Sequence, residues 1–165
     1  MAFTHLLVLA QGDGAVQPVT APEPRNLYEF NTDASDSVSS NNGTSTNITY
    51  NGSTAKFAGT TTSHIFFNNS VFWLNDFTIM IRLNMGVDST DKAILSLASS
   101  DPNYFLIYTR PTTSDIRIYY NGTTTDIPSS VLSTNTWYTV TVRRNGSTMS
   151  VFVDDQNLYS YTTDS

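Results

Sequence analysis

The stretch NTWYTVTVRRNGSTMSVFVDD, residues Asn135–Asp155, has the clearest structural signature in the chain. In the runs Tyr138–Val142 and Met149–Val153 every second residue is apolar, which places the side chains on two faces with the period of an extended strand. Between the runs stands Asn145-Gly146, a pair that favours positive φ at both central positions of a hairpin turn. The sequence therefore predicts an antiparallel hairpin. Its two faces both carry apolar residues, which is typical of a sheet packed on a second sheet.

Short strands separated by turn clusters continue along the chain from Leu27, and no window keeps a helical spacing of apolar residues. Strands that recur at about 8–12 residues are typical of an all-β sandwich or barrel. The run Phe77–Leu83 has the strongest apolar face, so we expect it at the centre of a sheet. The expected strands are Leu27–Phe30, Ile48–Tyr50, Thr54–Phe57, His64–Phe67, Phe77–Leu83, Ala93–Ser99, Tyr104–Tyr108, Ile116–Tyr120, Thr124–Ile127, Trp137–Val142, Thr148–Val153 and Leu158–Thr162.

Composition narrows the classes of protein. The chain has 165 residues, which suits one domain, and no cysteine, so neither disulfides nor thiolate metal sites are available. Its formal net charge is −6, and among the eight lysines and arginines only Arg143 and Arg144 are adjacent. Nucleic acid binding requires a clustered basic surface, so we expect no nucleic acid partner. The chain contains no run of about 18 apolar residues, and we expect no membrane insertion.

Residues 1–25 differ from the rest. The apolar run Leu6, Leu7, Val8 and Leu9 is followed by glycines and prolines, which favour an extended segment. The run is too short for the apolar core of a cleaved signal peptide. Such a segment is either a first strand that docks on its own domain or a tether that docks on a neighbouring protein. We favour an extended N-terminal arm whose run Leu6–Leu9 anchors a partner.

The order of the motifs resembles a laminin G-like domain of the concanavalin A-like jelly-roll group. The resemblance extends from Leu27 to about Thr163, and the segment around Trp137-Tyr138 matches best. The segments that carry it, in chain order, are NLYEFNTDASDSVSSNNGT, STAKFAGTTTSHIFF, NDFTIMIRLNM, AILSLAS, YFLIY, IRIYYNGT and TNTWYTVTVRRNGSTMSVFVDDQ.

The resemblance implies an all-β fold, a two-sheet antiparallel sandwich over residues 26–165, with ligands or partners at a concave face or at rim loops. Members of the group act as carbohydrate-binding or adhesion modules and as domains of viral structural proteins. Such domains usually close with one further strand after the segment that matches Leu158–Thr162. Its absence before Ser165 leads us to expect either a shortened domain or an edge that a partner strand fills.

The residues for catalysis are few. Glycoside hydrolysis requires two carboxylates across a cleft, and the only glutamates are Glu23 and Glu29. The histidines are His5 in the arm and His64 in an expected strand, and neither has a cysteine nucleophile to activate. We therefore expect a protein that is not an enzyme.

Two binding sites deserve a hypothesis. Some laminin G-like domains bind calcium at the rim, so that resemblance makes Asp88, Asp91, Asp154 and Asp155 candidate ligands, although aspartates also dominate ordinary turns, and we favour turns. No other cofactor is expected. Aromatic faces stack on sugars, and the strands supply five candidates, although packing within the sheets is the stronger interpretation. The candidate carbohydrate-binding residues are Trp137, Tyr120, Tyr119, Tyr104 and Tyr108.

Two functions remain open. In the first, the chain is a non-enzymatic structural or adhesion protein of a virus particle, a capsid decoration, fibre or tail component. Residues 1–25 would bind a capsid or tail protein, the chain would form a homo-oligomer in the virion, and the body would touch host glycans. In the second, it is a lectin-like carbohydrate-binding module of a larger cell-surface or secreted protein.

Overall fold

The computed structural model describes residues 2–9, 23–60, 62–67, 76–86, 91–97, 105–110, 115–120, 123–127 and 132–162. Within these ranges the chain forms fourteen strands and no helix. It divides into two compact units, one made of residues 1–83 and 138–165 and the other of residues 84–137.

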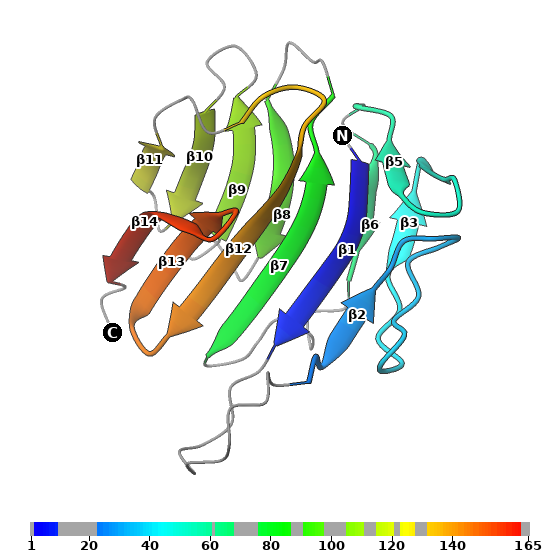
Figure 1. Ribbon diagram of the computed structural model, residues 1–165, viewed down its shortest axis with the longest axis horizontal. Coiled ribbons are helices and arrows are strands. Elements are labelled where there is room, and N and C mark those ends of the chain that lie inside the picture. Colours follow the sequence, from blue (N-terminus) through cyan, green and yellow to red (C-terminus); the bar gives the residue numbers. More distant parts are fainter. Residues whose placement is uncertain are drawn as a thin grey trace. The chain divides into compact units, whose positions relative to one another are not determined.

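The first unit is built on an eight-stranded sheet (Figure 1). Seven of its strands follow one another in hydrogen-bonded order, and the eighth, β2 (Asn26–Tyr28), pairs with β1. The seven, in order across the sheet, are β14 (Gln156–Thr162), β13 (Thr148–Val153), β12 (Trp137–Asn145), β7 (Phe77–Asn84), β1 (Ala2–Leu9), β5 (Ala55–Phe57) and β4 (Ile48–Tyr50).

The apolar alternation of β7 has the predicted consequence. Phe77, Ile79, Ile81 and Leu83 are all buried, while the residues between them are partly or fully exposed. The strand lies inside the sheet, between β12 and β1, as predicted from its apolar face (Figure 1). The neighbouring strands β12 and β13 continue this buried face through Val140, Val142, Met149, Val151 and Val153.

The predicted hairpin at Asn135–Asp155 is confirmed, but its turn is displaced by one residue. Asn145 is the last residue of β12 and pairs with Thr148, so the two loop residues are Gly146 and Ser147. Only Gly146 has a positive φ, of 58°. This is the pattern of a type II′ turn, which requires glycine at the first central position alone. The expectation that Asn145 would take a positive φ is therefore wrong.

The expected N-terminal arm is also wrong for the residues that can be described. Ala2–Leu9 form β1, which pairs with β2 through Leu6–Val8 and with β5 through Ala2 and Phe3. On its other side β1 is hydrogen-bonded to β7, so the strand is interior to the sheet (Figure 1). The alternative considered above, a first strand that docks on its own domain, describes this segment. An interior strand can satisfy its backbone donors and acceptors on both sides, and this favours docking over a free arm. Residues 10–22 lie outside the described ranges.

A two-stranded sheet completes the first unit. It pairs β3 (Thr44–Thr46) with β6 (His64–Phe66), and β3 was not predicted because its residues Thr-Ser-Thr have no apolar alternation. The nearby ring of Tyr28 is fully buried and lies 4.5 Å from the ring of Phe67. Gly43 leaves room for this packing, because a Cβ there would lie 2.8 Å from Phe67 Cε1 and 2.9 Å from Ile65 Cγ2.

The second unit contains a four-stranded antiparallel sheet in the order β11, β10, β9, β8. One face of this sheet is buried and holds Leu95, Phe105, Ile107, Thr109, Ile116, Ile118 and Ile127. The strands are β8 (Lys92–Leu97), β9 (Phe105–Arg110), β10 (Asp115–Tyr120) and β11 (Thr123–Ile127).

Candidate functional site

The other face of the four-stranded sheet is half-exposed and combines aromatic, charged and small residues. Strand register places these residues in two rows across the sheet. We call this surface the tyrosine–arginine face. One row consists of Ala93, Tyr108, Arg117 and Asp126, and the next consists of Ser96, Leu106, Tyr119 and Thr124.

Arg117 and Asp126 form the polar centre of this face. The guanidinium of Arg117 donates two parallel hydrogen bonds to the carboxylate, from Nε to Oδ1 and from Nη2 to Oδ2, the latter over 2.7 Å. This bidentate geometry is the strongest arrangement of an arginine and a carboxylate. The side chains are 23% and 44% exposed, so a ligand can reach the pair. The hydrogen bond from Arg117 lowers the pKa of Asp126, and the same bond raises the pKa of Arg117.

Tyr108 supports Arg117 from the neighbouring strand. The carbon of the guanidinium lies 5.8 Å from the centroid of the Tyr108 ring, within the range of a cation–π contact. A hydrogen bond of 3.5 Å from Arg117 Nη1 to the Tyr108 hydroxyl links the same residues. Tyr119 lies two residues beyond Arg117 on β10, so it shares this face. The two tyrosines are therefore both neighbours of Arg117, Tyr108 across the strands and Tyr119 along β10.

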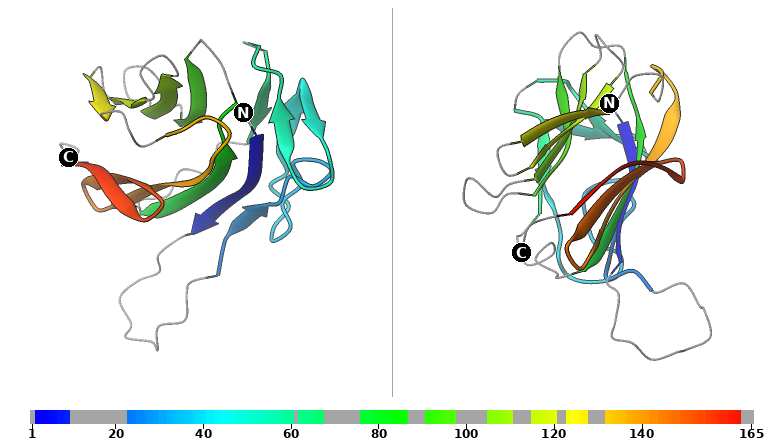
Figure 2. Two further views of the ribbon diagram at one scale, coloured as in Figure 1. Left: turned by 45° about the horizontal axis from the view of Figure 1, so that its top comes forward. Right: turned by 90° about the vertical axis from the view of Figure 1, so that its left-hand side faces the viewer.

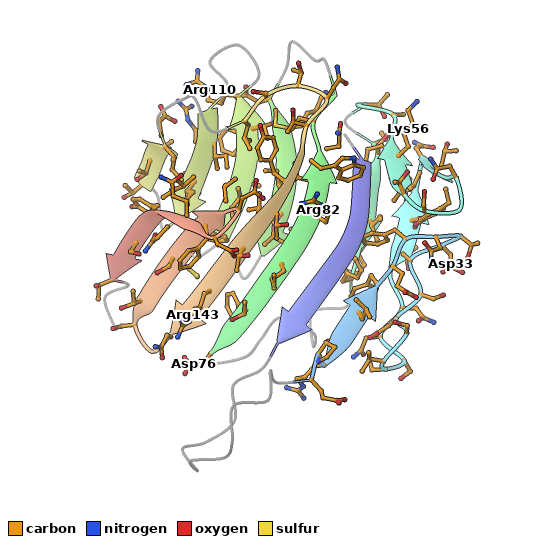
Figure 3. All side chains as sticks on the ribbon, viewed as in Figure 1. Asp33, Lys56, Asp76, Arg82, Arg110 and Arg143 are labelled. Carbon is orange, nitrogen blue, oxygen red and sulfur yellow. The ribbon has the colours of Figure 1, made fainter. Side chains whose placement is uncertain are left out.

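Arg110 extends the charged region at the end of β9 (Figure 3). Its Nη1 lies 3.6 Å from Asp126 Oδ2, and its Nε lies 4.0 Å from Asp91 Oδ2. Asp126 thus interacts with two arginines, and beside the hydrogen bond from Arg117 the positive charges of Arg117 and Arg110 also act to lower the pKa of its carboxyl.

The structure brings together two of the five aromatic residues predicted to bind carbohydrate. Tyr108 and Tyr119 share the tyrosine–arginine face. Tyr120 follows Tyr119 on β10, but its side chain is not among those described, and Tyr104 lies outside the described residues. Trp137 begins β12 in the eight-stranded sheet. The predicted binding role of all five remains a prediction.

The candidate calcium ligands are dispersed. Asp154 and Asp155 form the two-residue turn between β13 and β14, with φ of 46° and 67°, and Asp154 Oδ1 accepts a hydrogen bond from Thr139 N over 2.8 Å. Asp91 lies near Arg110, and Asp88 is outside the described residues. Within the described part of the chain, no group of three or more His, Cys, Asp or Glu side chains could hold a metal ion.

A second polar cluster surrounds Asp36 in the first unit. Asp36 is 8% exposed, and its carboxylate accepts hydrogen bonds from the backbone of Leu27, Val38 and Ser39 and from the side chains of Asn26 and Ser39. Burial acts to raise the pKa of Asp36, but these hydrogen bonds outweigh it and lower the pKa to about 2. The carboxylate is saturated by bonds from its own chain, so the cluster holds the loop after β2 in place rather than offering a ligand site.

Sequence reasoning missed Arg110, Arg117 and Asp126. A signal was present, because the hairpin IRIYYNGTTTDI has Asn121-Gly122 at its middle, and Tyr120 pairs with Thr123 on either side of it. Counting outward from that turn places Arg117 opposite Asp126, as observed. Its cross-strand neighbour Tyr108 comes from another hairpin and could not be found by counting.

The fold and this face define a class, an antiparallel all-β protein with an exposed aromatic and polar sheet surface. The chain belongs to the laminin G-like family of the concanavalin A-like lectin/glucanases superfamily, whose model matches residues 58–164, more than half of the chain. The predicted family and the predicted fold class, an all-β concanavalin A-like jelly roll, are therefore confirmed. The match does not include residues 27–57, which the sequence resemblance had included. No curated protein and no solved structure matches the chain.

Membership in the family indicates the function in broad terms. A domain of this kind is compatible with a carbohydrate-binding or adhesion module, and its lectin-type fold is generally non-enzymatic. The family finding gives no support to a phage origin or to a viral role. The described ranges contain no helix that is long and apolar enough to cross a membrane.

Proposed function

We propose that this chain is a non-enzymatic adhesion module that binds carbohydrate on the tyrosine–arginine face. The observation that carries the proposal is the placement of Tyr108 and Tyr119 next to Arg117, which is itself paired with Asp126. Sugars present apolar C–H faces that pack on aromatic rings, and hydroxyl groups that both donate and accept hydrogen bonds. A surface with two rings and an accessible ion pair offers partners for both.

The electrostatics of the face favour binding over catalysis. A glycosidase requires one carboxylic acid whose pKa is raised so that it can protonate the leaving group. The pKa of Asp126 is instead lowered by Arg117, so it stays ionised. The other described acids with a shifted pKa, Asp33 and Asp36, are shifted in the same direction.

The small residues at one side of the face are consistent with ligand access. Ala93 and Ser96 on β8 are exposed and stand beside Tyr108 and Leu106 respectively. The short side chain of Ala93 leaves the ring of Tyr108 accessible from that side. A glycan-binding module acts where glycans are displayed, so the proposal includes an extracellular or cell-surface setting. It does not include anchoring to a virion through residues 1–25, because Ala2–Leu9 form a strand of the sheet.

A glycan array followed by titration calorimetry tests the proposal. We expect the purified chain to bind at least one glycan with a dissociation constant between micromolar and millimolar, and the double variant Tyr108→Ala/Tyr119→Ala to lose at least tenfold in affinity. Stacking on an aromatic ring is worth about 0.5–1.5 kcal/mol, so two rings account for a loss of this size.

The matched control is Tyr159→Ala, which removes a half-exposed tyrosine from β14 in the other unit. It should bind as the unchanged chain does. A chain that is folded by circular dichroism but binds no glycan on the array would refute the proposal. Equal loss in the control and in the double variant would show that the face is not the site.

A further inference from the structure

We infer that the tyrosine–arginine face selects uncharged sugars over anionic ones, an inference that rests on the carbohydrate-binding function proposed above. The two arginines of the face suggest at first sight a site for uronates or other acidic sugars. The contacts of these arginines indicate the opposite preference.

The charges of the face are balanced from within. Arg117 is bound in bidentate fashion by Asp126, and Arg110 lies near both Asp126 and Asp91. Two arginines are therefore accompanied by two aspartates, and the whole chain carries a formal charge of −6. An approaching carboxylate or sulfate meets no net positive field.

Competition for Arg117 adds to this effect. A uronate carboxylate would bind a guanidinium best through the same pair of N–H groups that Asp126 already occupies. Asp126 is held opposite Arg117 by the strand register, so its effective concentration is far above that of a free ligand. Displacing it would also bring two carboxylates together, which is unfavourable.

A neutral sugar has no such obstacle. An ionised carboxylate has about four acceptor positions, and Arg117 uses one on each oxygen of Asp126. Sugar hydroxyl groups can donate to the remaining positions without breaking the ion pair. The pair then acts as an oriented, charge-assisted acceptor on the same face as the two tyrosine rings.

Titration calorimetry with paired ligands tests the inference on the full chain. Galactose and glucose oligosaccharides would be compared with galacturonate and glucuronate oligosaccharides of the same length, at 50 and 500 mM NaCl. We expect at least a tenfold preference for the neutral members and an affinity that changes less than twofold with salt. The variant Asp126→Asn keeps the shape of the side chain and removes its charge, and it should reduce the preference at least threefold and make uronate binding sensitive to salt.

Asp33→Asn is the matched control, since it makes the same change of charge on an exposed loop of the other unit (Figure 3). It should retain the preference. A ligand-free measurement adds a second check. Carboxyl titration by NMR should show a pKa of Asp126 below its ordinary value, and an ordinary pKa would mean that the ion pair does not form in solution and would overturn the inference. Preference of the unchanged chain for uronates would overturn this inference alone, whereas binding of neither ligand class would overturn the proposed function as well.

Discussion

At the scale of single residues, the first unit depends on one buried carboxylate. Asp36 accepts five hydrogen bonds from three backbone amides and two side chains, and these bring the loop after β2 back onto Leu27. The same loop receives the hydroxyl of Tyr28, which donates to the carbonyl of Asn41 over 2.7 Å. Burial and the nearby charge of Asp36 raise the pKa of Tyr28, so this donor keeps its proton. The arrangement explains how a loop rich in serine and asparagine is held in a defined conformation.

Asp36→Ala should destabilise the protein by about 3 kcal/mol or more. Each buried donor left without an acceptor costs about 1–3 kcal/mol, and several donors are affected. Chemical denaturation monitored by fluorescence would measure the loss. Asp33→Ala is the control on the same loop, since Asp33 is exposed and accepts a hydrogen bond from the backbone of Ser35, and it should cost about 1 kcal/mol or less. Equal effects of the two substitutions would contradict the role assigned to Asp36.

At the scale of elements, two adjacent hairpins reverse the direction of the chain with different types of turn. The turn between β12 and β13 has glycine at its one position of positive φ. The turn of the β13–β14 hairpin, drawn in orange to red in Figure 2, has positive φ at both central positions, Asp154 and Asp155. This is the pattern of a type I′ turn. Aspartate tolerates this region better than most residues, but glycine has no Cβ to oppose it. Asp76 supports the first turn through a hydrogen bond of 2.7 Å from Gly146 N, and it stands at the start of β7 (Figure 3).

Asp155→Gly should therefore stabilise the protein, by about 0.5–1 kcal/mol. Glycine removes the strain that a Cβ causes at a positive φ, and this gain in free energy exceeds the cost of the entropy that glycine adds to the unfolded chain. Gly146→Ala is the matched control of opposite sign, since it places a Cβ at a φ of 58° where no atom lies within 4 Å, so only backbone strain is added. It should destabilise by about 1 kcal/mol. Thermal unfolding measures both, and a lower melting temperature for Asp155→Gly would show that the aspartate contributes more through its side chain than through its backbone.

At the scale of the whole molecule, the N-terminal strand joins segments that are distant in sequence. β1 is hydrogen-bonded to β7 on one side and to β2 and β5 on the other, so it connects the early strands to the β12–β14 hairpins through β7 (Figure 1). A tether would leave the sheet intact when removed. An interior strand would not, because its loss exposes the unpaired edges of its neighbours.

Deletion of residues 2–9 should thus lower the melting temperature by about 10 °C or more, or abolish the cooperative transition. The loss of a strand paired on both sides amounts to several kcal/mol, and 1 kcal/mol corresponds to about 2–4 °C for a chain of this size. Differential scanning calorimetry measures the shift. Adding an excess of a peptide with the sequence of residues 1–10 should restore part of it by inserting as a strand. An unchanged melting temperature would instead support the expectation that these residues form an N-terminal arm outside the sheet.

The sequence by itself determined the class of the protein and most of its strands. The period of two is a local property, so strands such as Ile48–Tyr50 and Thr148–Val153 were predicted with their observed bounds. The tertiary structure alone decided where Ala2–Leu9 belong, because pairing between strands distant in sequence depends on which edges remain available once the nearer hairpins have formed. It also decided that Tyr108 stands beside Arg117, because residues 111–114 between β9 and β10 hold no Asn-Gly pair from which the register could be counted. The aromatic residues Tyr108 and Tyr119 could be proposed from the sequence, and the Asn121-Gly122 turn could also have placed Arg117 opposite Asp126, whereas the contact of Tyr108 with Arg117 required the register of β9 against β10.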